Sequence, residues 1–224
     1  MYGAWQRFAS CECYGEINAL KHRQGVPNLP APMIDPFQQS LTPAYFMRGG
    51  TSKGVFFLPE DLPVDVEARD AVLLRVMGSP DPYQQQRDGM GSATSSTSKV
   101  VLVSRSHRPD CDVDYLFGQV SIDKALIDWS GNCGNLTSAV GPFAIHRGLV
   151  SAPQDGEAVI HIWQANIQKK IVAHVPVRDG KVVELGDFEL DGVTFPSAEI
   201  RLEFLDPGSD GAEAGALPAD DGPV

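Results

Sequence analysis

The sequence predicts an α+β fold in which a sheet wraps around one buried helix, and two observations support this. Most apolar segments are short and rich in β-branched or aromatic residues, as is typical of strands. One segment, which begins near Gly131-Asn132-Cys133, is apolar on most sides and predicts a buried helix. Gly148 is suited to end that helix. Gly141-Pro142 predicts a kink in it or an earlier end.

Seven short segments have the composition of strands. Asp179-Gly180 favours a tight hairpin before the last of them. Asp65 is suited to cap a second helix, which runs to Met77 and stops at Gly78 and Pro80. The expected strands are, in chain order, residues 44–47, 55–58, 99–104, 113–122, 158–164, 170–177 and 182–183.

The two ends of the chain differ in composition from its centre. Residues 1–40 hold four prolines and no sustained hydrophobic period, so we expect a poorly ordered extension there. Residues 206–224 carry five acidic residues and no Lys or Arg, which is typical of an acidic flexible tail. The folded body is therefore expected at residues 41–205.

Composition excludes several classes of partner. The chain has 18 Lys+Arg against 29 Asp+Glu and a formal net charge of −11, so neither nucleic acid nor an anionic membrane is expected to bind a general basic surface. Four cysteines do not make a disulfide framework. No signal-peptide pattern and no bilayer-spanning apolar stretch are visible. These features predict a cytoplasmic protein.

The most informative run is Gly131-Asn132-Cys133-Gly134-Asn135, because it places a thiol at the first turn of the buried helix. Helix N-termini carry unpaired N–H donors and the positive end of the helix dipole, which stabilise anions and thiolates. A carboxylate substrate could share that terminus with Cys133. The candidate substrate-binding residues around it are Asn132, Gly134 and Asn135. The alternative is a buried structural cysteine beside a tight turn.

A run rich in glycine and hydroxyl residues, 88–98, leads into Lys99 at the start of an apolar strand. A lysine partly buried at a strand edge beside a cleft is suited to act as a base. Gly91 is a candidate substrate-binding position in this run. The spacing of Gly89 and Gly91 is not a dinucleotide fingerprint, because a strand follows rather than a helix. The alternative is a flexible loop with a solvated lysine.

The stretch from Arg48 to Gly54 contains G-x-S-x-G, the pattern of a hydrolase nucleophile elbow. That motif requires a helix after the turn, and here a strand is expected, so the hydrolase interpretation fails. The remaining interpretation is a glycine turn whose hydrogen-bond donors are suited to carboxylates. Among them, the Arg48 guanidinium can bind a carboxylate through two parallel hydrogen bonds. The alternative is an ordinary hairpin with polar tips. The candidate substrate-binding residues are Arg48, Gly50, Thr51, Ser52 and Lys53.

A metal site is not expected. No two histidines have helical metal-ligand spacing, and Cys11-x-Cys13 has no second pair.

Three motifs in this order resemble the PrpF-type 2-methylaconitate cis-trans isomerases, of the diaminopimelate-epimerase-like superfamily: residues 47–54, 88–99 and 128–135. The resemblance implies an epimerase-like N-terminal lobe, in which a mixed or antiparallel sheet curls around a central helix. It also implies cofactor-free proton transfer on an unsaturated tricarboxylate, in propionate catabolism through the methylcitrate cycle. In that family a lysine and a cysteine flank the substrate, and the matching positions are Lys99 and Cys133.

Members of that family are longer, and this chain matches only one of their two lobes. Other interpretations therefore stay open: a related oxalomesaconate-type tautomerase, or a catalytically inactive lobe that survives as a carboxylate-binding remnant. The face against which a second lobe would pack predicts a homo-oligomer.

Overall fold

The computed structural model describes residues 4–9, 13–16 and 41–205. These residues form an eleven-stranded sheet, two α-helices and one short 3₁₀ helix. The helices are α1 (Val66–Met77), α2 (Gly134–His146) and η1 (Pro59–Asp61). The strands are β1 (Ala4–Ala9), β2 (Cys13–Glu16), β3 (Tyr45–Gly49), β4 (Ser52–Phe57), β5 (Lys99–Arg105), β6 (Val113–Val120), β7 (Ile127–Asp128), β8 (Gly156–Gln164), β9 (Lys169–Arg178), β10 (Lys181–Val182) and β11 (Glu199–Phe204).

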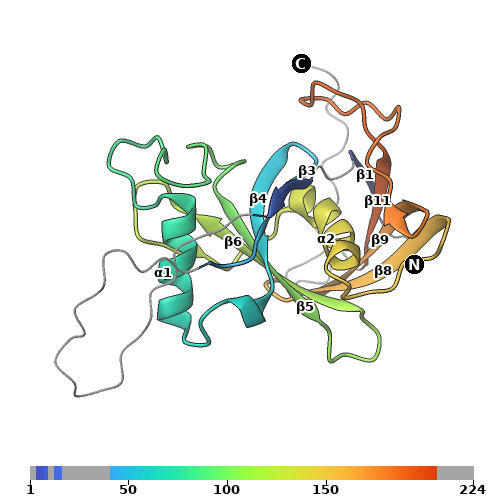
Figure 1. Ribbon diagram of the computed structural model, residues 1–224, viewed down its shortest axis with the longest axis horizontal. Coiled ribbons are helices and arrows are strands. Elements are labelled where there is room, and N and C mark those ends of the chain that lie inside the picture. The colour runs from blue at the N-terminus through green and yellow to red at the C-terminus, as the bar shows by residue number, and fades with distance from the viewer. Residues whose placement is uncertain (1–3, 10–12, 17–40, 206–224) are drawn as a thin grey trace, which may run out of the picture.

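The sheet is mixed and curls around α2. Its strand order is β1-β11-β9-β8-β6-β5-β4-β3-β2, with β10 added to β9 and β7 added to β6. The β4–β5 and β6–β8 pairs are parallel, and the other pairs are antiparallel. Helix α2 contacts β3 and β4 near one end of the sheet as well as β9 and β11 near the other (Figure 1). The predicted fold class is therefore confirmed.

Both faces of the sheet bury apolar side chains, because successive residues of a strand point to opposite faces. One cluster packs between the sheet and α2, and the other between the sheet and α1. In β5, Val101 and Val103 belong to the α2 cluster. Val100 and Leu102 belong to the α1 cluster. Along β5, alternate side chains therefore face α2 and α1.

Helix α1 has the predicted ends. The Asp65 carboxylate accepts a hydrogen bond from the Ala68 N–H at 2.9 Å, as expected of an N-cap. Gly78 ends the helix in the left-handed conformation, with a φ of 75°.

Helix α2 runs further than an earlier end at Gly141-Pro142 would allow, because it continues through Pro142 to His146. Proline has no N–H to donate to the Ser138 carbonyl, which normally weakens a helix. Ser138, Pro142 and the residues around them are buried against the sheet, and this packing holds the helix together.

The hairpin at Asp179-Gly180 is present as predicted. Both residues have positive φ, 52° and 70°, the backbone that two-residue hairpins favour. β9 and β10 pair on either side of them.

Two strands lie within residues 1–40, where the sequence predicted a poorly ordered extension. β1 pairs with β11, and β2 pairs with β3. Backbone pairing to an existing sheet edge needs no sustained apolar period, so a segment without such a period can still form a strand. Residues 1–3, 10–12 and 17–40, and the expected tail at 206–224, lie outside the described residues. Among the described residues, no helix is both long and apolar enough to cross a bilayer.

Replacing Asp65 with alanine tests the cap of α1. Asp65→Ala leaves the Ala68 N–H without its acceptor, so we expect the free energy of unfolding to fall by about 1 kcal/mol. Urea denaturation measures it. Asp187→Ala, which removes an exposed carboxylate, is the matched control and should change stability by less than about 0.5 kcal/mol. Equal effects would contradict the capping role.

Candidate active site

The N-terminus of α2 sits directly against the β3–β4 hairpin. At Gly49 a Cβ would lie 2.5 Å from the Asn135 carbonyl oxygen, so only glycine permits this approach. The Thr51 N–H donates to Asn135 Oδ1 at 3.3 Å. These contacts fix the first turn of the helix beside the turn of the hairpin.

Cys133 is the N-cap residue of α2 and is partly buried. Its side chain does not cap the helix. Instead, the thiol points toward Ser52 Oγ, at 3.8 Å. The first amides of the helix have no carbonyl one turn earlier to bind, so an anion could use them.

The buried hydroxyl of Tyr115 lies close enough to Cys133 to interact with it electrostatically. Tyr115 is fully buried, and this burial raises the pKa of its hydroxyl well above the ordinary value. The negative charge of a Cys133 thiolate would raise that pKa further, whereas a hydrogen bond with Thr137 lowers it. Tyr115 therefore stays protonated at neutral pH and presents a neutral hydroxyl near Cys133. Thr137 also donates to the Cys133 carbonyl, at 2.9 Å.

Lys99 begins β5, and its side chain is almost fully buried, with 7% exposed. Its Nζ donates to Gln119 Oε1 at 2.7 Å. The same ammonium lies 4.9 Å from the centre of the Phe117 ring, in a cation–π contact. The solvated lysine that was the alternative is therefore not what the structure has.

Lys99 and Cys133 lie on the same face of the sheet. A Cβ at Gly54 would meet both the Leu136 side chain, at 3.0 Å, and the Lys99 Cβ, at 3.3 Å. Gly54 thus faces α2, with Lys99 on the neighbouring strand on one side and the first turn of α2 above it. Ser52 comes two residues earlier in β4 and contacts Cys133 on this same face.

Arg48 and Lys53, which we expect to bind a carboxylate, lie on the face of the hairpin opposite to Ser52 and Gly54. They are register partners in the hairpin, and each stands between residues that face α2. Arg48 is buried and donates to the Gly50 carbonyl at 3.1 Å, which supports the turn. Lys53 Nζ lies 5.8 Å from the Phe46 ring centre. Strand alternation is the physical reason for this separation.

Gly91 packs against a buried glutamine of its own loop. A Cβ there would be 2.2 Å from Gln86 Oε1, so Gly91 makes room for a fully buried glutamine. The Gln86 amide donates to Ser98 Oγ at 2.7 Å and accepts from the Ala93 N–H at 2.9 Å. Gly91 therefore makes room for Gln86, and Gln86 holds the loop that leads into Lys99.

Asp81 holds the other end of this loop. Its carboxylate accepts from the N–H groups of Tyr83, Gln85 and Gln86 at 2.7–2.9 Å. The Tyr83 and Gln85 bonds lower the pKa of Asp81 below its ordinary value.

Sequence reasoning missed three residues that support the candidate pair. Tyr115, Phe117 and Gln119 alternate along β6 and face α2. A polar residue that continues an inward-facing apolar row was the available signal for Gln119. Asn166 was missed as well: its side chain accepts from the Phe117 N–H and donates to the Phe117 carbonyl, both at 2.8 Å.

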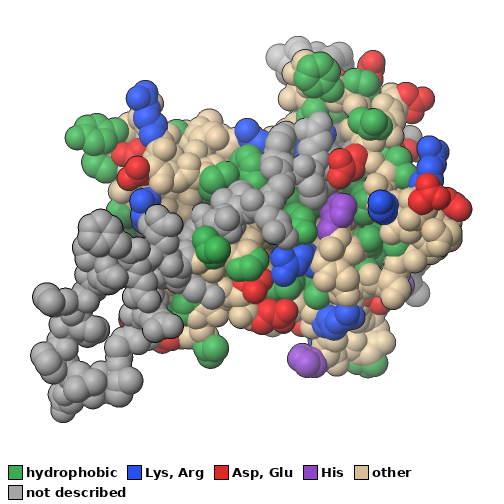
Figure 2. Space-filling view, viewed as in Figure 1, with side chains coloured by type: hydrophobic (Ala, Val, Ile, Leu, Met, Phe, Trp, Pro, Cys, Tyr) green, Lys and Arg blue, Asp and Glu red, His purple; other side chains and the backbone are tan. Residues whose placement is uncertain are grey.

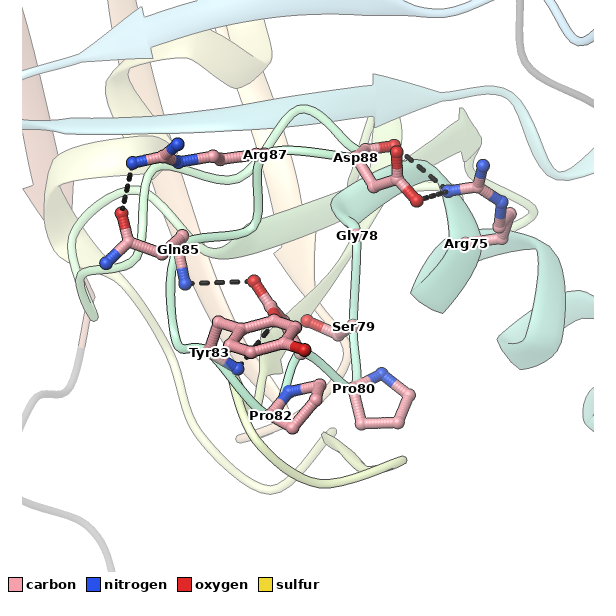
Figure 3. A pocket seen from close by; sticks show the side chains of 10 residues that line it. Arg75, Gly78, Ser79, Pro80, Pro82, Tyr83, Gln85, Arg87 and Asp88 are labelled. Atoms are coloured by element: carbon pink, nitrogen blue, oxygen red, sulfur yellow. Dashed lines mark hydrogen bonds and ion pairs between the residues drawn. The ribbon is translucent and has the colours of Figure 1, made fainter.

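Two hollows in the described surface are lined by other residues. One, of about 920 Å³, lies along the loop from Gly78 to Asp88. In Figure 3 the Arg75–Asp88 and Arg87–Gln85 pairs lie along one part of it, and Tyr83, Pro80 and Pro82 lie along another. The second, of about 390 Å³, includes Cys111, whose pKa is raised by burial and by Asp110. Neither includes Lys99 or Cys133.

Charged groups are dispersed over the visible surface. On the face shown in Figure 2, acidic side chains are interspersed with Lys and Arg. In the described part of the chain, no group of three or more His, Cys, Asp or Glu residues is arranged to hold a metal ion.

Comparison with known proteins gives consistent matches. A family model described as PrpF protein matches residues 39–222, a range that extends into the expected acidic tail. A protein of Cupriavidus necator named 2-methyl-aconitate isomerase is 65% identical over 180 residues, which are 77% of this chain and 46% of that protein. A protein of a Novosphingobium species named (4E)-oxalomesaconate Delta-isomerase is 52% identical over 175 residues, covering 78% of this chain and 48% of that protein.

Among solved structures, one titled as a methylitaconate-delta-isomerase superposes with a TM-score of 0.67 at 46% identity. The match covers 70% of this chain and 40% of that one. The chain thus spans about half the length of the curated relatives that it matches.

Replacing Gly49 with alanine tests the close contact between α2 and the β3–β4 hairpin. The new methyl group would collide with the Asn135 carbonyl, so we expect Gly49→Ala to lower the free energy of unfolding by about 1–3 kcal/mol. Urea denaturation measures it. In Gly131→Ala the new methyl group meets nothing within 4 Å, and this control should change stability far less. Equal stability of the two variants would contradict the close approach.

Asp81 gives a pH prediction. Because its pKa is lowered in the fold, its stabilising contribution is present above an unfolded-state pKa of about 3.9 and is lost as the pH falls below that value. We expect the Tm of Asp81→Asn to fall less steeply than that of the wild type between about pH 5 and pH 3, in thermal melts. Asp187→Asn is the control. An unchanged slope in Asp81→Asn would show that the loop does not depend on the carboxylate.

Proposed function

Because the chain belongs to the PrpF family, we propose that it carries the acid–base pair of a cofactor-independent isomerase that moves a proton on an unsaturated tricarboxylate. The proposed reaction is the cis-trans isomerisation of 2-methylaconitate, in propionate catabolism through the methylcitrate cycle. The 65% identity to the Cupriavidus necator protein of that name supports this substrate. The observation that carries the proposal is a buried lysine amine on the same sheet face as a thiol at a helix N-terminus.

In the proposed reaction, Lys99 acts as the base. Its neutral amine takes a proton from the carbon next to the double bond, and the electron pair left behind spreads through that double bond into a conjugated carboxylate. The former double bond then has single-bond character and rotates. Return of a proton, from the Lys99 ammonium or from the Cys133 thiol, restores the double bond in the other isomer. General acid–base catalysis of this kind contributes about 10²- to 10⁴-fold.

Polar groups at the hairpin and the helix would stabilise the charge that develops on the carboxylate. Ser52 lies beside the thiol, and Thr51 contacts Asn135. The first amides of α2 add donors and the positive end of the helix dipole. Arg48 and Lys53 have no place in this proposal, because their side chains lie on the other face of the hairpin.

A related tautomerase that acts on oxalomesaconate is the second candidate, and the Novosphingobium relative favours it. It would use the same two residues. A catalytically inactive lobe that binds carboxylates is the third. The proposal further includes a tricarboxylate as the small-molecule partner, a cytoplasmic location and a homo-oligomer.

Proton exchange tests the proposed reaction. Incubated with 2-methylaconitate in deuterated water, the wild-type chain should exchange the substrate's allylic protons, which proton NMR detects as a loss of signal. Lys99→Ala and Cys133→Ala should exchange at least about 100-fold more slowly. Lys124→Ala and Cys111→Ala, at residues outside the site, are the matched controls and should keep the wild-type rate. Wild-type exchange no faster than that of Lys99→Ala would end the catalytic proposal.

A labelling experiment separates the remaining candidates. If the site binds tricarboxylates, trans-aconitate should slow the alkylation of Cys133 but not that of Cys111. Protection without proton exchange would favour the carboxylate-binding remnant. Exchange that is faster with oxalomesaconate than with 2-methylaconitate would favour the tautomerase.

A further inference from the structure

We propose that Gln119 is the positioning residue for Lys99: it holds the amine in place in both of its protonation states. This inference rests on the proposed function, since it assigns Lys99 the role of the base. Gln119 is the register partner of Lys99 on the neighbouring antiparallel strand, so the two side chains leave the sheet side by side on the face toward α2.

The orientation of the Gln119 amide is fixed by its other end. Its Nε2 donates to the Ser98 carbonyl at 2.8 Å, and a carbonyl can only accept. Oε1 must therefore face Lys99, at 2.7 Å from Nζ. A flipped amide would place two donors against an ammonium and lose both bonds. The acceptor is thus aimed at the lysine before any substrate arrives.

Gln119 is neutral, and this suits a base. Lys99 Nζ contacts the Gln119 oxygen and the Phe117 ring, and within the described residues no carboxylate forms an ion pair with it. An ammonium and a neutral amine both have an N–H to donate to that oxygen. Lys99 can therefore lose and regain a proton without losing its anchor. A carboxylate in the same place would favour the ammonium form and oppose its action as a base.

The Ser98 carbonyl belongs to the residue just before Lys99, so the same glutamine fixes both the backbone and the amine. Ser98 is buried, and its hydroxyl accepts from Gln86. Because the buried Gln86 loop holds Ser98 from the other face of the sheet, the acceptor that orients Gln119 is itself held in place.

Two substitutions at Gln119 separate positioning from a merely structural role. Gln119→Leu removes the acceptor and keeps most of the volume, so we expect kcat for 2-methylaconitate to fall about 10- to 100-fold with KM within about twofold of wild type. Gln119→Glu keeps the acceptor but adds a charge. Its activity should be low at pH 7 and should recover as the pH rises, whereas that of Gln119→Leu should not. Gln154→Leu, an exposed glutamine outside the site, is the control.

A second measurement does not depend on catalysis. Acylation of Lys99 by acetic anhydride, followed by mass spectrometry between pH 7 and pH 12, reports the fraction of neutral amine. In Gln119→Glu the midpoint of labelling should move up by about one pH unit or more, and in Gln154→Leu it should not move. If the wild type catalyses no proton exchange, the proposed reaction fails, but this measurement still tests the contact.

The proposal is overturned by an unchanged labelling midpoint in Gln119→Glu, or by a folded Gln119→Leu with the kcat and pH profile of the wild type. If Gln119→Leu does not fold, the labelling midpoint of Gln119→Glu decides.

Discussion

The close approach of α2 to the β3–β4 hairpin is the contact on which the candidate site depends. Helix α2 is buried over most of its length, so its first turn is where its backbone can meet a ligand. Gly49 lets that turn rest on the hairpin, and Thr51 and Ser52 then reach Asn135 and Cys133. A side chain at Gly49 would push the helix away and separate these groups. The absence of a side chain at Gly49 therefore sets the position of the Cys133 thiol.

Strand β4 connects this contact to the lysine and divides the hairpin into two functions. Its parallel pairing with β5 starts next to Lys99, so the residues of β4 that face α2 lie between the lysine and the helix. Val55 and Phe57 of β4 face the other way and pack in the α1 cluster. Lys53 lies on that same side of β4, with its ammonium near the Phe46 ring. A run that looks like a single binding motif in the sequence therefore serves the candidate site with one set of side chains and the sheet with the other.

The environment of Lys99 is notable in a chain whose net charge is −11. The protein surrounds this amine with a glutamine oxygen and an aromatic face rather than with a carboxylate. Both partners attract a cation without a full opposing charge. A lysine held in this way keeps its position while its charge changes, which a structural ion pair would resist.

The amino-acid sequence alone predicts the central helix, the capped helix α1 and the Asp179-Gly180 hairpin, and it singles out Lys99 and Cys133 as candidates. Each depends on local chemistry: apolar periodicity, a capping carboxylate, backbone with positive φ, or a thiol at a helix start. It did not give β1 and β2, whose backbones pair with distant strands, nor the place of Arg48 and Lys53. These features follow from the folded arrangement, because register and strand pairing set which face a side chain occupies. The Gln119 contact has the same cause: residues twenty positions apart become neighbours only when β5 and β6 pair.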